Sequence, residues 1–403
     1  MTLKDEIMPR AGSTTIDPRN TNRVRESPAT SQAAPPTSAP KTGDGRDLFA
    51  TFTPRPGESL LQLLERAARA VPRHARLVSM TIFNGKAEFA AVQRELPALF
   101  GEIAWPVTWL ESEASPSDAP AGIEWHAVTN AATSIRTLHL HDRVVGCAWD
   151  DDFARHCVLG DLRDPAVDHS APEQTRRVIE DMIEALAQAG MTFRHVYRTW
   201  FRNRDILGWY HEFNQVRTDF FQRQKVFDGL LPASTGISAA NPHGAALIAG
   251  LWAMMPQDPA ARACVVPSPL QDSACRYGSS FSRAVEVDYG DHRHLTVSGT
   301  ASIGPDGNTM HVGDINAQID LTMRVVRAIL NSRQMDWPDV VRGLVYCRHP
   351  EDIGAYARWA AAQKVTLPVI ELNHTVCRDD LLYEIEVDAC SSRPLGDKTP
   401  TRV

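Results

Sequence analysis

The sequence has no long run of apolar residues and no excess of positive charge. No stretch approaches the roughly 18 consecutive apolar residues of a membrane-spanning helix, and residues 1 to 46 carry charges without an apolar signal core. Lys and Arg number 42 against 49 Asp and Glu, so the net charge is −7, which argues against nucleic acid as the main partner. We therefore expect a cytoplasmic protein that binds neither nucleic acid nor a membrane.

Motifs for metals and nucleotide cofactors are also lacking. The seven cysteines are widely spread and never form a CxxC pair, which favours reduced thiols over a disulfide framework or a zinc site. Two HxH pairs, His139 with His141 and His292 with His294, have no evident third and fourth ligand. Since neither a GxGxxG nor a P-loop pattern occurs, the sequence indicates no metal and no organic cofactor.

Length and composition indicate a globular protein with more than one unit. The chain has 403 residues, of which 43% are hydrophobic and 23% charged, and a length prior of roughly 150 residues per domain favours two or three units. Residues 1–46 are rich in Pro, Ser, Thr, Ala and charge and have almost no apolar periodicity. We interpret them as a disordered leader.

The chain repeats itself weakly after 144 positions. Each of the two segments contains an amphipathic helix, near 173–189 and 316–332, followed by a strand that ends in arginine, near 193–202 and 339–347. The shift superposes seven identical pairs: Gly160 on Gly304, Gln174 on Gln318, Leu186 on Leu330, Met191 on Met335, Val196 on Val340, Arg198 on Arg342 and Arg204 on Arg348. We infer two divergent copies of one α+β unit, with a boundary that divides the chain into 47–230 and 231–403.

Strand patterns support the α+β class. Alternating apolar residues predict strands at 76–82, 282–288, 294–302 and 382–387. Hairpin-like turns join some of these strands, and the helices follow them. The pattern therefore predicts mixed β-sheets with helices packed on one face, and excludes a doubly wound sheet.

A polar face is predicted on a helix within residues 202–221. Tyr210, Asn214 and Arg217 are spaced by four and three residues, so they share one face of a helix. A hydroxyl, an amide and a guanidinium on one face suit a ring-bearing carboxylate, and arginines are concentrated around this segment. The alternative is an amphipathic surface helix whose aromatic residues belong to the core and whose arginines are solvated.

A second candidate lies near the end of the chain. Glu384 and Glu386 point to one face of a predicted strand. If that face is buried, one carboxyl is pushed toward its protonated form, as a general acid requires; the alternative is a solvent-facing strand edge. Cys377 precedes Glu384 by seven residues, and a turn at 378–380 could return it to the same pocket, although a lone cysteine is usually inert core.

These motifs resemble the chorismatase family, which includes 3-hydroxybenzoate synthases and chorismate hydrolases. The most specific segments are CRHPED at 347–352 and CRDDLLYEIE at 377–386, supported by WYHEFNQVRTDFF, STGISAAN, YGSSFSRA and SGTASIGPDG. The resemblance covers most of the chain from about residue 50. It implies a C-terminal region like the RidA (YjgF) proteins, and hence two RidA-like units in tandem with the catalytic one at 231–403.

The resemblance also implies a reaction and its residues. Glu384 would protonate the enolpyruvyl ether of chorismate, so that pyruvate leaves without metal or organic cofactor. Cys377, where hydrolytic members typically have alanine, favours 3-hydroxybenzoate as the second product, with 4-hydroxybenzoate left open. Substrate contacts are expected from Tyr210, Arg217, Tyr277, Gln318 and Arg348. We expect a monomer, and the alternatives are a chorismate hydrolase, a RidA-like imine deaminase and a ligand-binding protein.

Overall fold

The computed structural model describes residues 41–42, 47–83, 85, 88–112, 120–129 and 135–392, without the side chains of Lys41, Thr42 and Tyr277. All of them belong to one compact unit, residues 36–403. The leader predicted for residues 1–46 lies outside the described residues, except for Lys41 and Thr42.

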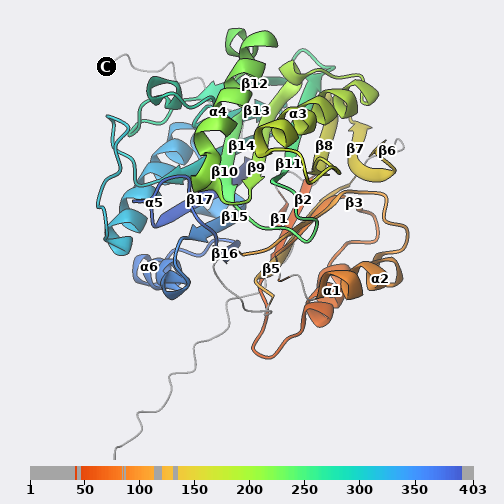
Figure 1. Cartoon of the computed structure of the whole chain (residues 1–403), viewed down its shortest axis with the longest axis horizontal. Coiled ribbons are helices and arrows are strands. Elements are labelled where there is room, and N and C mark those ends of the chain that lie inside the picture. Colours follow the sequence, from red (N-terminus) through yellow and green to blue (C-terminus); the bar gives the residue numbers. More distant parts are fainter. Residues whose placement is uncertain are drawn as a thin grey trace, which may run out of the picture. The chain divides into compact units, whose positions relative to one another are not determined.

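The described part of the chain forms three mixed sheets, each built from a separate stretch of sequence (Figure 1). We call these stretches the first copy (41–128), the second copy (136–256) and the third copy (262–391). Each sheet combines antiparallel pairs with one parallel pair at its edge. The predicted α+β class with mixed sheets is confirmed.

The described residues of the first copy form five strands, in the order β1-β2-β5-β3-β4, and two helices. Their bounds are β1 Lys41–Thr42, β2 Asp47–Phe52, α1 Leu60–Arg69, β3 Arg76–Phe83, α2 Phe89–Phe100, β4 Val107–Leu110 and β5 Gly122–Val128. A capping box between Ser59 and Gln62 starts α1. The helix buries Leu60, Leu63, Leu64 and Ala67 against the sheet.

The second copy forms a six-stranded sheet in the order β10-β9-β11-β8-β7-β6. Its elements are β6 Arg136–Leu140, β7 Arg143–Asp150, β8 Ala154–Leu162, α3 Ala171–Gln188, β9 Val196–Asn203, α4 Ile206–Arg223, β10 Ala233–Ser238 and β11 Leu247–Pro256. Ser170 caps α3 by accepting a hydrogen bond from the backbone N–H of Glu173. The helices α3 and α4 contact each other and cover one face of this sheet (Figure 1).

The third copy repeats that order in a second six-stranded sheet, β12-β13-β14-β17-β15-β16. Its elements are β12 Arg262–Val266, β13 Ala284–Asp288, β14 Arg293–Ala301, α5 Ile315–Ser332, β15 Val340–Cys347, α6 Ala355–Gln363, β16 Val369–Asn373 and β17 Tyr383–Ser391. The order β13-β14-β17-β15-β16 in the third copy corresponds strand by strand to β7-β8-β11-β9-β10 in the second copy. The first sheet, read from β1, has it as well.

Shared geometry explains the repeat seen in the sequence. Gln174 of α3 and Gln318 of α5 each donate a hydrogen bond of 3.3 Å to the carbonyl oxygen seven residues earlier. Each also accepts a 2.8 Å hydrogen bond from the backbone N–H of a residue just before the last strand of its copy, Ala246 or Leu382. The two glutamines therefore hold the same junction between helix and sheet in both copies.

The predicted shift and boundary need two corrections. Gly160 lies on β8, whereas Gly304 lies beyond the end of β14, because the connection from β14 to α5 is longer than the connection from β8 to α3. The boundary expected between residues 230 and 231 divides the second sheet, since β10 and β11 follow it and pair with β9 and β8. We propose a boundary between β11 and β12 in its place.

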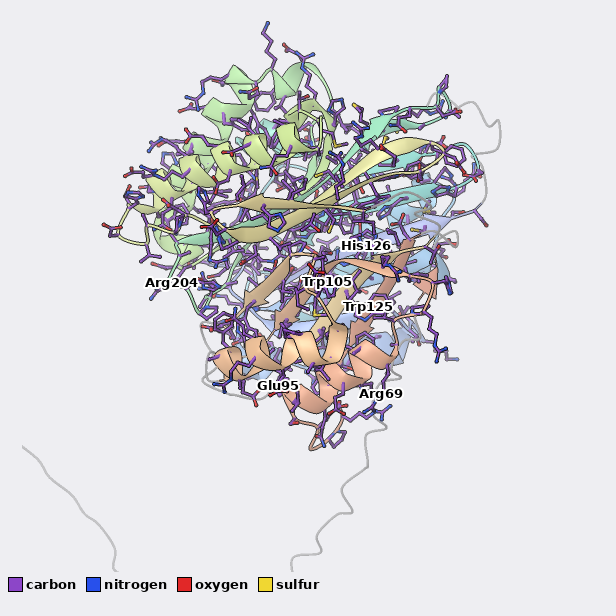
Figure 2. All side chains as sticks on the ribbon, turned by 90° about the vertical axis from the view of Figure 1, so that its right-hand side faces the viewer. Arg69, Glu95, Trp105, Trp125, His126 and Arg204 are labelled. Carbon is purple, nitrogen blue, oxygen red and sulfur yellow. The ribbon has the colours of Figure 1, made fainter. Side chains whose placement is uncertain are left out.

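The strand β5 shows how each sheet separates two environments. The indole N–H of Trp125 donates a 3.2 Å hydrogen bond to the carbonyl oxygen of Ala67 in α1. Its neighbour His126 points to the other face (Figure 2). There the centre of its ring lies 5.5 Å from that of Trp252 in the second copy. Alternation along a strand thus places one residue under the helices and the next against another copy.

Buried ion pairs join the three copies. Arg342 of β15 donates to Glu124 of β5 at 2.9 Å, and within the third copy to Glu386 and Asp388 at 2.9 and 2.6 Å. Arg198 of β9 pairs with Glu386 at 2.9 Å. The side chain of Glu124 is 13% exposed, and the other four are almost entirely inaccessible to solvent. We call Arg198, Arg342, Glu124, Glu386 and Asp388 the central ion network.

We predict that Arg342→Met destabilises the protein severely, because it leaves Glu124, Glu386 and Asp388 without their shared cation. Breaking a buried pair from one side costs about 3–5 kcal/mol. Equilibrium unfolding in urea measures this loss.

The matched control is Arg327→Met. Its ion pair with Asp336 has a similar length, 2.9 Å, but its side chains are 52% and 39% exposed, so the expected loss is below about 1 kcal/mol. Equal losses in the two variants would contradict the assigned role of the network.

Candidate active site

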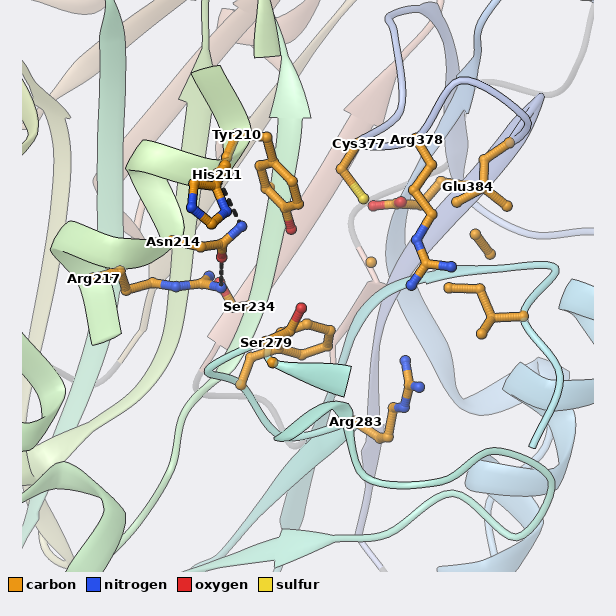
Figure 3. A pocket seen from close by; sticks show the side chains of 17 residues that line it. Tyr210, His211, Asn214, Arg217, Ser234, Ser279, Arg283, Cys377, Arg378 and Glu384 are labelled. Carbon is orange, nitrogen blue, oxygen red and sulfur yellow. Dashed lines mark hydrogen bonds between the residues drawn. The ribbon is translucent and has the colours of Figure 1, made fainter. Parts of the chain in front are cut away.

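A cavity of about 450 Å³ lies between the second and third copies (Figure 3). The second copy contributes one wall, formed by Tyr210, His211, Asn214 and Arg217 of α4 and by Ser234 and Gly236 of β10. The third copy contributes the facing walls, which include Ser279, Arg283, Gly299, Cys377, Arg378 and Glu384. The helix face predicted from the spacing of Tyr210, Asn214 and Arg217 therefore lines the cavity.

Glu384 reaches the cavity from β17. Its side chain is buried, and it lies so close to Gly299 that a side chain at position 299 would clash with the carboxyl group. Burial raises the pKa of Glu384 to about 8, assisted by the negative charge of Glu386 and opposed by the charges of Arg198 and Arg283. At neutral pH this carboxyl group is therefore mostly protonated and can act as an acid.

Glu386 shares a strand face with Glu384 but does not line the cavity. Its carboxylate accepts hydrogen bonds from Arg198, Arg342 and the indole N–H of Trp200, each at 2.9 Å. Burial acts to raise the pKa of Glu386, but the surrounding arginines lower it below its usual value. Of the two glutamates, one is held as an anion and the other faces the cavity as an acid.

Cys377 lies beside Glu384, opposite Tyr210 (Figure 3). Burial raises the pKa of its thiol to about 12, and the neighbouring Glu384 adds to this effect. The hydroxyl of Tyr210 faces the thiol, and burial raises the pKa of this hydroxyl well above its usual value. Both groups are thus neutral at physiological pH, so Cys377 is not a thiolate nucleophile.

Arg217 is a buried cation that faces the cavity. Its guanidinium donates a 2.6 Å hydrogen bond to Oδ1 of Asn214 and lies 5.0 Å from the centre of the Phe213 ring. No carboxylate pairs with it among the described residues, and its Nε has no hydrogen-bond partner there. Burial lowers the pKa of Arg217. A buried guanidinium of this kind is prepared to bind an anion.

Gln318 and Arg348 lie behind the cavity wall and do not line it. Gln318 donates a 2.8 Å hydrogen bond to the carbonyl oxygen of Asp380 and accepts one from Leu382, while Arg348 donates to the carbonyl oxygens of Arg378 and Asp379. Both therefore hold the 378–382 loop that follows Cys377. We propose that they position this loop, in place of the direct substrate contact expected from the sequence.

Tyr277 ends a short 3-10 turn, Ala274–Tyr277, directly before Gly278 and Ser279 of the cavity wall. Its side chain lies outside the described residues.

Two cavity arginines were not among the predicted site residues. The side chain of Arg283 is buried and donates a 3.0 Å hydrogen bond to the carbonyl oxygen of Asp272, and Arg378 donates one of 2.7 Å to that of Gly307. Both lie inside segments that the sequence had already singled out, YGSSFSRA and CRDDLLYEIE. The presence of an arginine in each of these segments could have identified both residues as candidates for the site.

The HxH pairs do not form a metal centre. His141 bonds to Asp181 at 3.0 Å and His294 to Asp388 at 3.2 Å. In the part of the chain that the structure describes, no three His, Cys, Asp or Glu side chains are placed to hold a metal ion. No helix among those residues is long and apolar enough to cross a membrane.

We predict that Cys377 reacts slowly with iodoacetamide at about pH 8, although it lines an open cavity. Alkylation requires the thiolate, which a pKa of about 12 makes rare, so labelling should be at least roughly tenfold slower than at the exposed Cys275. Peptide mass spectrometry of the time course measures both rates. Equal rates would show that Cys377 is ionised.

Comparisons with known proteins place this fold. Neither a family model nor a curated protein matches the sequence. Among solved structures, a chorismatase superposes with a TM-score of 0.60 over 85% of this chain and 98% of its own, at 19% identity. A putative endoribonuclease L-PSP from Entamoeba histolytica (18% identity) and the Rid protein YyfA from Yersinia pestis (20% identity) each cover 32% of this chain and 98% of their own, with TM-scores of 0.28. The chain thus has the fold of the chorismatase.

Proposed function

We propose that this protein is a chorismatase that cleaves the enolpyruvyl ether of chorismate to pyruvate and 3-hydroxybenzoate. The observation that carries the proposal is the pairing, in one cavity, of a carboxyl group that is protonated at neutral pH, Glu384, with a buried cation that has no carboxylate partner among the described residues, Arg217. The likeness in fold to a chorismatase supports it.

The acid suits the first step of the reaction. Glu384 donates its proton to the methylene carbon of the enolpyruvyl group, which leaves an oxocarbenium ion at the ether carbon. Water adds to that carbon, and collapse of the adduct breaks the ether bond and releases pyruvate. A general acid works best with a pKa near the working pH, and the pKa of about 8 at Glu384 meets this requirement.

The cations suit a dianionic substrate. Chorismate carries one carboxylate on its ring and one on its enolpyruvyl group. Arg217 approaches from the second copy and Arg378 from the third, so two carboxylates can be held at separate positions. A cavity of about 450 Å³ lies within the usual range of roughly 300–1,000 Å³ for small-molecule sites.

The second product is decided after pyruvate has left. The ring product either remains a dihydroxycyclohexadiene carboxylate or loses water and becomes aromatic. In the second case the water added equals the water lost, so chorismate divides into hydroxybenzoate and pyruvate. We assign this outcome to the neutral Cys377 thiol, which lies beside Glu384 and opposite Tyr210.

We predict that Glu384→Gln abolishes turnover and preserves binding. Glutamine keeps the size and polarity of the side chain but cannot supply the proton, so the rate should fall by about 10²- to 10⁴-fold. A coupled pyruvate assay measures turnover, and calorimetric titration with chorismate measures affinity, which should stay within a few-fold. Turnover that survives this change would rule out Glu384 as the acid.

We predict that Cys377→Ala shifts the ring product from 3-hydroxybenzoate towards the dihydrodiol, while pyruvate is still released. Chromatography of the products at complete conversion measures the ratio. Cys275→Ala is the matched control, because this exposed cysteine is not among the residues lining the cavity, and it should leave the ratio unchanged. An unchanged ratio in Cys377→Ala would remove the assigned role.

A further inference from the structure

Two carboxyl groups on one face of β17 have opposite surroundings. Glu384 faces the cavity, while Glu386, two residues further, is completely inaccessible to solvent. The donors to Glu386 come from two copies: Arg198 and Trp200 from the second and Arg342 from the third. Its negative charge is therefore fixed by the fold and is separated from the substrate.

We propose that Glu386 is a positioning residue whose fixed negative charge keeps Glu384 in its protonated form. The inference rests on the proposed function, since it explains how the acid of that reaction is kept ready. Arg198 and Arg283 both favour an ionised Glu384. Without the charge of Glu386, only burial would oppose these cations, so the pKa of Glu384 would fall and a smaller fraction of it would carry a proton to donate.

Thr235 connects the network to the acid through the backbone. Its Oγ1 accepts a 2.7 Å hydrogen bond from Arg198 and one of 3.0 Å from the backbone N–H of Gly299. Gly299 is the residue whose missing side chain leaves room for the Glu384 carboxyl group. Arg198, which pairs with Glu386, is thus linked through Thr235 to the backbone beside the Glu384 carboxyl group.

The second copy lacks both carboxylates. Arg202 of β9 and Tyr346 of β15 are separated by the 144 residues of the repeat. Arg202 is paired with Ile248 and Tyr346 with Glu384, so Ile248 is the counterpart of Glu384. By the same register, Gly250 is the counterpart of Glu386. The two glutamates are therefore present together in one copy and absent together in the other, as expected if they act as a pair.

The test is the pH dependence of turnover in Glu386→Gln. Activity requires protonated Glu384, so it is lost as the pH rises through the pKa of that group. Removing a like charge should move this alkaline limb down by about 1 pH unit or more, with activity at pH 5 to 6 kept within a few-fold. A uniform loss at every pH, or an unmoved limb, would overturn the proposal.

Charge variants provide the matched comparison. Glu386→Asp keeps the negative charge, so the alkaline limb of its pH profile should lie where it does in the wild type. Arg198→Gln removes an opposing cation and should move this limb to higher pH. Glu124→Gln also removes a partner of Arg342, but it leaves Glu386 in place and should not move the limb. A structural role alone would not shift the limb in opposite directions, so downward movement in Arg198→Gln would overturn the proposal even where Glu386→Gln fails to fold.

A second readout separates this proposal from the proposed function. The carboxyl band of Glu384, identified in infrared difference spectra by its loss in Glu384→Gln, is titrated in the full-length protein without substrate. A midpoint lower in Glu386→Gln than in the wild type supports the proposal even if chorismate is not turned over. Equal midpoints overturn it even if chorismate is a substrate.

Discussion

Glu386 is a fully buried carboxylate, and it stays ionised only because arginines from two copies of the fold surround it. An isolated ion in that position would be too costly to bury, so the surrounding sheets must come together correctly for the charge to exist. Through Arg342 and Glu124 the first copy joins the same network. The protonation of the acid in the cavity therefore depends on how the second and third sheets meet, and the first sheet is joined to the same network.

The copies share one architecture but contribute different residues to the cavity. The second and third copies share strand order and the glutamine that joins helix to sheet. The acid stands on the third copy, while the buried cation and the tyrosine that faces it stand on the second. The site is thus complete only where two different copies meet.

Local pattern predicted much of this structure. The spacing of Tyr210, Asn214 and Arg217 predicted a shared helix face, and alternation at Glu384 and Glu386 predicted a shared strand face. Sequence alone did not reveal the first copy, because its likeness lies in strand order. It also could not separate Glu384 from Glu386, or place Arg348 behind the wall, since both depend on long-range contacts such as those of Arg198 and Arg378.

Incubation of the purified protein with chorismate alone shows most directly whether it is a chorismatase. The products are separated by chromatography, and pyruvate is assayed in the same sample. We expect one pyruvate and one 3-hydroxybenzoate for each chorismate consumed, with no added cofactor. Chorismate that remains intact, under conditions in which the protein is folded, would show that the protein is not a chorismatase.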